Sequence, residues 1–189
     1  MKKQIKVTLI VIVAAIIAAA IIWYVMYLRG KEQDLLTPVG TRAEFIGDTD
    51  KYPTMLTAKG TQILNADGEQ VVLKGVMVPE SRSLYEEKKF NEDFYKDVFA
   101  KGGNAIRVPI SPVEYKNDDY YMWRYLDRIV TWAGENDNYV ILDWDYTGNP
   151  IDGSGDEMPD LDENPLDYSA EFWKNIADYF KNTPNVIFE

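Results

Sequence analysis

The side chains of this sequence that are able to take part in chemistry are carboxylates, arginine, lysine and tyrosine. The sequence contains no cysteine and no histidine. This composition excludes Ser-His and Cys-His nucleophilic machinery, disulfides and thiolate metal sites, and it removes the commonest protein ligand of transition metals. Any reaction must therefore rest on acids such as Glu80 and Asp145, on basic side chains such as Arg107, and on backbone groups.

Each of these three residues lies in or just after an apolar run. Glu80 follows the run Leu73–Val78, Arg107 lies inside Ala105–Ile110, and Asp145 closes a third run. An arginine within an apolar strand is costly unless it is paired. We therefore expect Arg107 either to neutralise carboxylates at the end of the strands or to hold a catalytic carboxylate in its ionised form.

Two aromatic residues, Trp144 and Tyr146, flank Asp145. Flat aromatic rings cover the apolar faces of pyranose sugars, so the pair is a candidate sugar-contacting surface. Ordinary packing of the aromatic rings into a hydrophobic core is the alternative, and for Trp144 the sequence favours neither.

The apolar runs alternate with segments of helical periodicity. Strands are predicted at Thr61–Leu64, Val71–Lys74, Leu73–Val78, Ala105–Ile110, Tyr139–Asp143 and from Val186, and helices over residues 90–99, 122–133 and 172–180. The residues Asn65–Gly68 predict a hairpin turn between the first two strands. Continuous apolar strands that alternate with helices indicate a parallel sheet covered by helices, and function gathers at the carboxyl ends of such strands.

The amino terminus predicts a membrane anchor. Val7–Leu28 is an apolar run that at ~1.5 Å per residue spans roughly 33 Å, the thickness of the hydrocarbon core of a bilayer. Three lysines precede it, which places the amino terminus in the cytoplasm and the rest of the chain on the outer face. We expect residues 1–28 to be a cytoplasmic stub with a transmembrane signal anchor and 29–53 to be a linker. A cleaved signal peptide, which would make the protein secreted, is the alternative.

Charge is distributed unevenly along the chain, whose formal net charge is -11. Residues 1–30 carry four basic and no acidic side chains, so the remainder is more acidic still. An acidic body repels phosphate backbones, and we expect no nucleic-acid partner. The acidic, glycine-containing segment 152–163 is interpreted as a solvated loop, with a hard-cation site as the alternative.

Several segments resemble glycoside hydrolase family 5, the cellulase family. The resemblance is carried by Gly60–Val76, by Gly103–Ile110, by Tyr125–Gly134 with Tyr139–Trp144, and by Phe172-Trp173 with Pro184–Glu189. It covers roughly residues 55–189 and implies an α/β fold of the (β/α)8 TIM-barrel type. Residues 54–189 would form roughly the first half of that barrel, which typically needs ~250 residues.

The resemblance also implies a chemistry. A retaining hydrolase of β-linked polysaccharides uses two glutamates about 5–5.5 Å apart, one as acid/base and one as nucleophile. By the family pattern both glutamates follow Glu189, so none of the residues of this chain is assigned as catalytic. Arg107 matches the family arginine that hydrogen-bonds the nucleophile. Asp145 stands where the family usually has a histidine, and its negative charge would raise the pKa of nearby glutamates.

We therefore expect an endoglucanase- or mannanase-like hydrolase whose substrate-binding residues in this chain are Glu80, Arg107, Trp144, Asp145 and Tyr146. No cofactor and no metal is expected, and the chain as given is expected to be inactive. The alternative is a non-catalytic, membrane-anchored half-barrel that binds glycan. A calcium-dependent surface protein is a third hypothesis, supported by the 152–163 segment.

Overall fold

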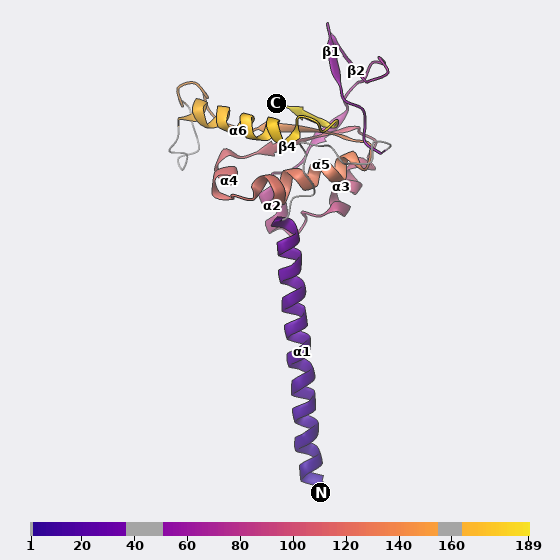
Figure 1. The fold of residues 1–189 in the computed structure, drawn as a ribbon, viewed down its shortest axis with the longest axis vertical. Helices are drawn as coiled ribbons and strands as arrows, with labels where there is room; N and C mark the ends of the chain where they lie inside the picture. The colour runs from indigo at the N-terminus through magenta and orange to yellow at the C-terminus, as the bar shows by residue number, and fades with distance from the viewer. Residues whose placement is uncertain (1, 37–50, 155–163) are drawn as a thin grey trace. The chain divides into compact units, whose positions relative to one another are not determined.

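The computed structural model describes residues 2–36, 51–154 and 164–189, which fall into two units, Met1–Thr37 and Pro38–Glu189 (Figure 1).

The first unit is a single helix, α1, Lys2–Leu36. Within it, Ile12–Gly30 is long and apolar enough to cross a membrane, and its side chains are exposed. Apolar residues surround this helix on all sides, as is usual where lipid is the solvent. The helix continues past Leu28, so residues 29–36, predicted to begin a linker, are helical; the rest of that linker up to residue 50 lies outside the described residues.

The second unit is built on a four-stranded sheet in the order β3-β4-β5-β6, with every neighbouring pair parallel. Its strands are β3 (Gly75–Met77), β4 (Ala105–Ile110), β5 (Tyr139–Trp144) and β6 (Val186–Phe188). The predicted parallel sheet is therefore confirmed, and its four strands begin within two residues of their expected starts. A parallel pair requires a crossover, and each crossover here contains helix.

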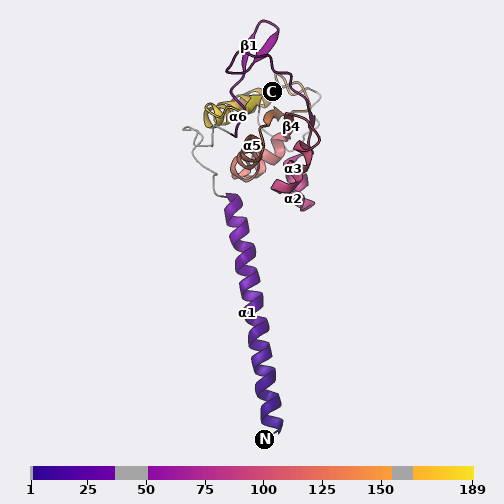
Figure 2. The same cartoon turned by 90° about the vertical axis from the view of Figure 1, so that its right-hand side faces the viewer.

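Helices cover one face of this sheet (Figure 2). They are α2 (Ser81–Glu86), α3 (Glu92–Phe99), α4 (Pro112–Asn117), η1 (Met122–Leu126), α5 (Asp127–Gly134) and α6 (Pro165–Phe180). The helical periodicity over residues 122–133 corresponds to η1, a π-helical turn, followed directly by α5. The two short helices α2 and α4 were not predicted, because six residues are too few to show a period.

The hydrophobic core lies between the sheet and these helices. On β4 it takes alternate residues, Ile106, Val108 and Ile110, which are at most 1% exposed. Val140 and Leu142 repeat the pattern on β5. Because side chains alternate between the two faces of a strand, the residues between them face the opposite side of the sheet, and Arg107 is one of these.

A small two-stranded sheet precedes the parallel one. Strand β1 (Thr57–Lys59) pairs with β2 (Gln62–Leu64) across a turn at Gly60, whose φ of 61° suits glycine. The predicted turn at Asn65–Gly68 is also present, since the Gly68 amide donates to the Asn65 carbonyl over 3.1 Å. The expected strand Val71–Lys74 is wrong, because the pairing with β2 ends with a bridge between Leu64 and Gln70 and a hydrogen bond from the Val71 amide to the Ile63 carbonyl.

Tyr52, which precedes β1, packs against the carboxyl-terminal end of α5. The ring of Tyr52, 7% exposed, occupies the space that a side chain at Gly134 would need, and its hydroxyl lies 3.5 Å from the Thr131 carbonyl oxygen. The packed unit therefore begins at or before Tyr52, slightly earlier than the predicted domain boundary at residue 54.

This contact reverses the usual effect of replacing a helical glycine. Gly134→Ala is expected to destabilise the second unit by about 1–3 kcal/mol, because the new methyl group overlaps the Tyr52 ring. In a Tyr52→Ala background the same change is expected to be neutral or stabilising by up to about 1 kcal/mol, the normal preference of a helix for alanine. Urea unfolding of the four proteins in detergent micelles measures this cycle, and equal effects of Gly134→Ala in both backgrounds would contradict it.

Candidate functional site at the carboxyl ends of the strands

Arg107 pairs with acidic residues from two further strands. Its Nε lies 2.8 Å from Glu189 Oε2 and its Nη2 lies 3.2 Å from Glu189 Oε1, so the two side chains meet in a bidentate arrangement. Nη2 also lies 3.0 Å from Asp143 Oδ2, and Nη1 lies 3.1 Å from the Met77 sulfur. One guanidinium thus joins residues of β3, β4 and β5 to the residue that follows β6.

Strand register explains how these residues meet. Arg107 is aligned with Met77 on one side and with Ile141 on the other, and aligned residues of paired strands point to the same face. Asp143 is two residues beyond Ile141 and so shares that face. All of them lie opposite the helix-covered face, toward the carboxyl ends of their strands.

Asp143 and Glu189, the two acidic partners of Arg107, differ in burial, and the pKa values of their carboxyl groups are shifted in opposite directions. Asp143 is only 7% exposed, and burial raises the pKa of its carboxyl group; Arg107 opposes this, while Asp145 and Glu189 add to it. The hydrogen bond from Arg107 lowers the pKa of the half-exposed Glu189. Hydrogen bonding to Glu189 in turn raises the pKa of Arg107, so this cation is fixed at the edge of the sheet.

Asp145 and Tyr146 continue from the end of β5. The Asp145 amide donates to the Ile110 carbonyl over 3.1 Å, which holds the residue beside the end of β4. Its carboxylate is exposed and contributes negative charge to the surroundings of Arg107 and Asp143. Tyr146 is half-buried. The roles of Arg107, Asp145 and Tyr146 in substrate binding stay predictions.

Trp144 points to the other face of the sheet. Its ring stacks on Phe172 of α6 with centroids 3.9 Å apart, and its Nε1 donates to Ser169 Oγ over 2.8 Å. Tyr115 and Tyr168 contact it edge-on. These contacts favour core packing, the second of the two interpretations of Trp144, because Phe172 covers one face of the ring and the side chain is partly buried against the core.

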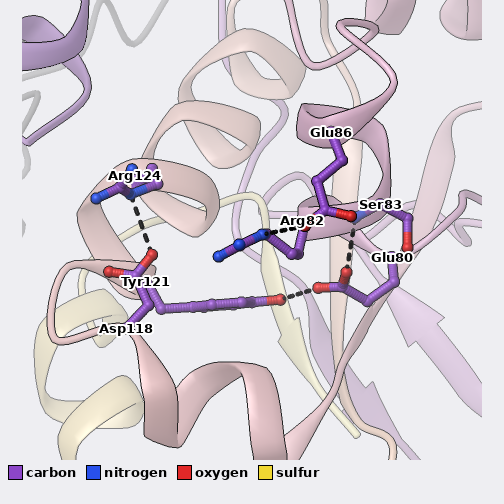
Figure 3. Close-up of polar contacts among 7 residues, drawn as sticks. All are labelled: Glu80, Arg82, Ser83, Glu86, Asp118, Tyr121 and Arg124. Atoms are coloured by element: carbon purple, nitrogen blue, oxygen red, sulfur yellow. Dashed lines mark hydrogen bonds and ion pairs between the residues drawn. The ribbon is translucent and has the colours of Figure 1, made fainter.

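Glu80 lies at the start of α2, where its carboxylate accepts hydrogen bonds from two protein groups (Figure 3). Its Oε2 accepts a hydrogen bond from the Ser83 amide over 3.0 Å, which caps the helix, and its Oε1 accepts one from the Tyr121 hydroxyl over 2.6 Å. Burial, followed by the charge of Glu80, raises the pKa of Tyr121 well above its ordinary value. The geometry gives Glu80 a role in joining two loops, and its predicted role in substrate binding remains a prediction.

Sequence reasoning did not assign Asp143 or Glu189 to the site. A usable signal was present, since Asp143 is an acid inside an apolar run, and such a residue needs a cationic partner as much as Arg107 needs an anionic one. Glu189 carries no such signal, because its pairing depends on the register of β6 against β5.

A hollow of about 220 Å³ borders the Arg107 side of the sheet, lined among others by Met77, Arg107 and Ile141. A separate hollow of about 620 Å³ lies near the amino ends of β3 and β4, beside Gly102 and Gly103, and contains none of the acidic residues around Arg107. Neither hollow is lined by Asp143, Asp145 or Glu189, and Arg107 lines the smaller of the two.

Among the described residues, no group of three or more acidic side chains is arranged to hold a metal ion. In the predicted loop 152–163, the described residues 152–154 form a turn in which Asp152 Oδ1 accepts from the Ser154 amide over 2.9 Å. The remainder of that loop lies outside the described residues.

Comparison with known proteins identifies relatives of the second unit. The family model described as Cellulase (glycosyl hydrolase family 5) matches residues 64–189. Endoglucanase A of Butyrivibrio fibrisolvens is 28% identical over 155 residues, which is 74% of this chain and 32% of the relative. Endoglucanase C of Evansella cellulosilytica is 25% identical over 188 residues, covering 85% of this chain and 22% of the relative. The chain therefore spans a third or less of the length of these curated relatives.

Solved structures show the same fold. The beta-glucanase SdGluc5_26A of Saccharophagus degradans is 24% identical with a TM-score of 0.66, covering 77% of this chain and 44% of that one; it has also been solved in complex with cellotetraose. The alkaline cellulase K catalytic domain is 22% identical with a TM-score of 0.50, covering 80% of this chain and 41% of that one. The parallel sheet with its helices is thus an α/β arrangement that matches part of these enzymes.

The pairing of Arg107 predicts a pH-dependent loss of stability when it is removed. Arg107→Met is expected to destabilise the second unit by about 1–2 kcal/mol at pH 7, because Asp143 becomes a buried, unpaired charge. This is less than for a fully buried pair because the Arg107 side chain is 36% exposed. The loss is expected to shrink as the pH falls toward 4, since the pKa of Asp143 is raised and its protonation removes the unpaired charge from the variant, whereas the lowered pKa of Glu189 keeps that carboxylate ionised in the native protein.

Urea unfolding at pH 7 and pH 4.5 measures this difference. Lys181→Met is the matched control, because it breaks an exposed ion pair with Asp178 and is expected to leave the unfolding midpoint unchanged. A loss for Arg107→Met that is the same at both pH values would contradict the assignment of Asp143 as its partner.

The charge of Asp145 predicts how its removal changes the pKa of Asp143. Asp145→Asn is expected to lower the pKa of Asp143, because it removes a negative neighbour that disfavours ionisation. NMR titration of the Asp143 carboxyl carbon measures this shift. An unchanged or raised pKa would show that Asp145 does not lie within electrostatic reach of the site.

Proposed function

The chain belongs to the cellulase family, glycosyl hydrolase family 5, and we propose that its second unit is the amino-terminal half of the catalytic barrel of a retaining hydrolase that cuts β-linked glucan chains internally. Glycoside hydrolysis is the function of the family. The substrate and the internal mode of cleavage are proposed from the names of the relatives, which include two endoglucanases and a beta-glucanase.

The observation that carries this proposal is the position of Arg107. It is fixed by Asp143 and Glu189 at the carboxyl ends of the parallel strands, the edge at which barrel enzymes gather their catalytic groups. A permanent cation there stabilises an ionised carboxylate beside it, and a retaining glycosidase needs one such carboxylate as nucleophile.

In this proposal the two reacting carboxyl groups belong to sequence that follows Glu189. The acid/base and the nucleophile of the family pattern both follow that residue, and Arg107 would hydrogen-bond the nucleophile. The residues of this chain then bind and orient the sugar and set the charge state of the catalytic pair. No cofactor is required for this chemistry.

We further propose that α1 anchors the enzyme. Its apolar segment Ile12–Gly30 meets the length requirement for crossing a bilayer, and Lys2, Lys3 and Lys6 precede it. The positive-inside rule then places the barrel on the outer face of the membrane, where insoluble polysaccharide is accessible. Cleavage of the segment as a signal peptide would give a secreted enzyme instead.

Asp145 favours a second candidate function, a glycan-binding half-barrel without catalysis. The family usually has a histidine at this position. The neutral imidazole of a histidine can donate a hydrogen bond to a sugar hydroxyl, whereas the ionised carboxylate of Asp145 can only accept one. With Asp143 and Glu189 nearby, Asp145 also gives the site three carboxylates against one arginine. Such a site can bind sugar hydroxyls as an acceptor surface without supplying an acid.

Hydrolysis of carboxymethylcellulose separates these functions. The chain by itself is expected to release no reducing sugar, because by the family pattern both catalytic glutamates follow Glu189. A protein translated from the reading frame continued beyond Glu189 is expected to be active, and Arg107→Met in that protein is expected to lower kcat/KM by about a hundredfold through incorrect ionisation of the nucleophile.

Lys181→Met in the longer protein is the control and is expected to retain full activity, since the exposed pair it breaks is on the helix-bearing side of the unit. Hydrolysis by the chain alone would overturn the assignment of the catalytic groups. An inactive longer protein that still binds cello-oligosaccharides would favour the binding function.

A further inference from the structure

Two aromatic side chains that the proposed function does not use lie together near the start of η1, Tyr120 on the loop before it and Trp123 in its first turn. Tyr120 is 44% exposed, and Trp123 is partly exposed. Their ring centroids are 5.9 Å apart and their planes are inclined by 53°. An exposed aromatic ring forgoes the free energy that burial of its apolar surface would give. An adjacent pair of such rings therefore indicates a surface that is covered when a ligand binds.

This loop is held in place at its start by Asp118 (Figure 3). Asp118 Oδ1 accepts a hydrogen bond from the Tyr120 amide over 2.9 Å, and Oδ2 pairs with Arg124 Nε at 3.0 Å. Both side chains of this ion pair are largely buried, with exposed fractions of 11% and 17%. One carboxylate therefore contacts both the backbone amide of Tyr120 and the side chain of Arg124, the residue after Trp123.

A second attachment joins the same loop to α2. The Tyr121 side chain is 1% exposed, lies between Tyr120 and η1, and donates its hydroxyl hydrogen to Glu80 over 2.6 Å (Figure 3). The backbone at Tyr120 is therefore held by the bond from its own amide to Asp118 and by the buried side chain of Tyr121. Preorganisation of this kind reduces the entropic cost of binding.

The loop also lies on the relevant edge of the sheet. It follows α4, which starts directly after the carboxyl end of β4, and it precedes the helix that returns to the amino end of β5. The loops that follow β3 and β4 are joined by the Glu80–Tyr121 bond, and Arg107 lies on β4. The aromatic pair and the Arg107 site thus belong to the same end of the barrel strands.

We propose that Tyr120 and Trp123 form a glucan-binding subsite at the edge of the cleft, which holds one glucose unit of a β-linked chain; this rests on the proposed function. The inclination of the rings makes the pair a corner, so that one ring covers an apolar face of the sugar while the other contacts its edge. The exposed Asp119 carboxylate beside them accepts hydrogen bonds from sugar hydroxyls. The subsite contributes affinity and takes no part in the chemical step.

The test measures binding of cellohexaose to the full chain in detergent micelles by titration calorimetry. Replacement of both rings by leucine (Tyr120→Leu with Trp123→Leu) is expected to weaken binding about tenfold, because leucine keeps apolar volume but offers no flat face. Tyr120→Phe is expected to bind as the native chain does, because it retains the ring. Val72→Ala is the control, since Val72 is an apolar side chain with 58% exposure outside this loop.

The outcomes separate this subsite from the proposed function. If the native chain binds no cellohexaose, the subsite is wrong, and hydrolysis of carboxymethylcellulose by the longer protein still tests the proposed function separately. If the native chain binds and the double leucine variant binds equally well, the subsite is wrong and the proposed function stands. Loss of self-association in the leucine variant, with cellohexaose affinity unchanged, would assign the pair to a contact between copies and also overturn the subsite. Thermal unfolding of each variant shows that it is folded.

Discussion

The pairing of Arg107 with Asp143 and Glu189 is the interaction on which the arrangement of the site depends. A guanidinium on one face of an apolar strand requires anionic partners, and the partners here come from the neighbouring strand and from the residue after the next one. The three groups meet only when β4, β5 and β6 are parallel and in their observed register. Charge pairing and strand alignment therefore support each other.

This pairing also explains why the two faces of the sheet differ so much. One face of β4 and β5 carries aliphatic side chains that are buried by helices, and Trp144 belongs to that face. The other face carries Arg107 and Asp143, whose polar groups must satisfy one another. The alternation of side chains along a strand is what allows one short segment to contribute both to a hydrophobic core and to a charged site.

The loops at the carboxyl ends are fastened by a second set of polar contacts. Glu80 caps α2 and accepts from Tyr121, while Asp118 holds the backbone of Tyr120 and pairs with Arg124. These bonds link residues that are distant in sequence, and they fix the surroundings of the cleft without taking part in its chemistry. Rigid support of this type is what a binding site needs if its affinity is not to be lost in ordering mobile loops.

The sequence by itself determined the parts of this protein that follow from local patterns. The apolar amino-terminal segment, the strands at Ala105–Ile110 and Tyr139–Trp144, and the longer amphipathic helices are each specified by the periodicity of their own residues, and the motifs in their order identified the family. Short elements such as α2 and α4 depend on a few capping contacts, and the segment Val71–Lys74 pairs with β2 only at its start. Contacts of this kind produce no periodic pattern in the sequence. Only the tertiary structure decided which acids meet Arg107, and that Glu80 joins two loops while Trp144 enters the core. These outcomes depend on strand register and on contacts between residues as far apart as Arg107 and Glu189, and no local pattern encodes them.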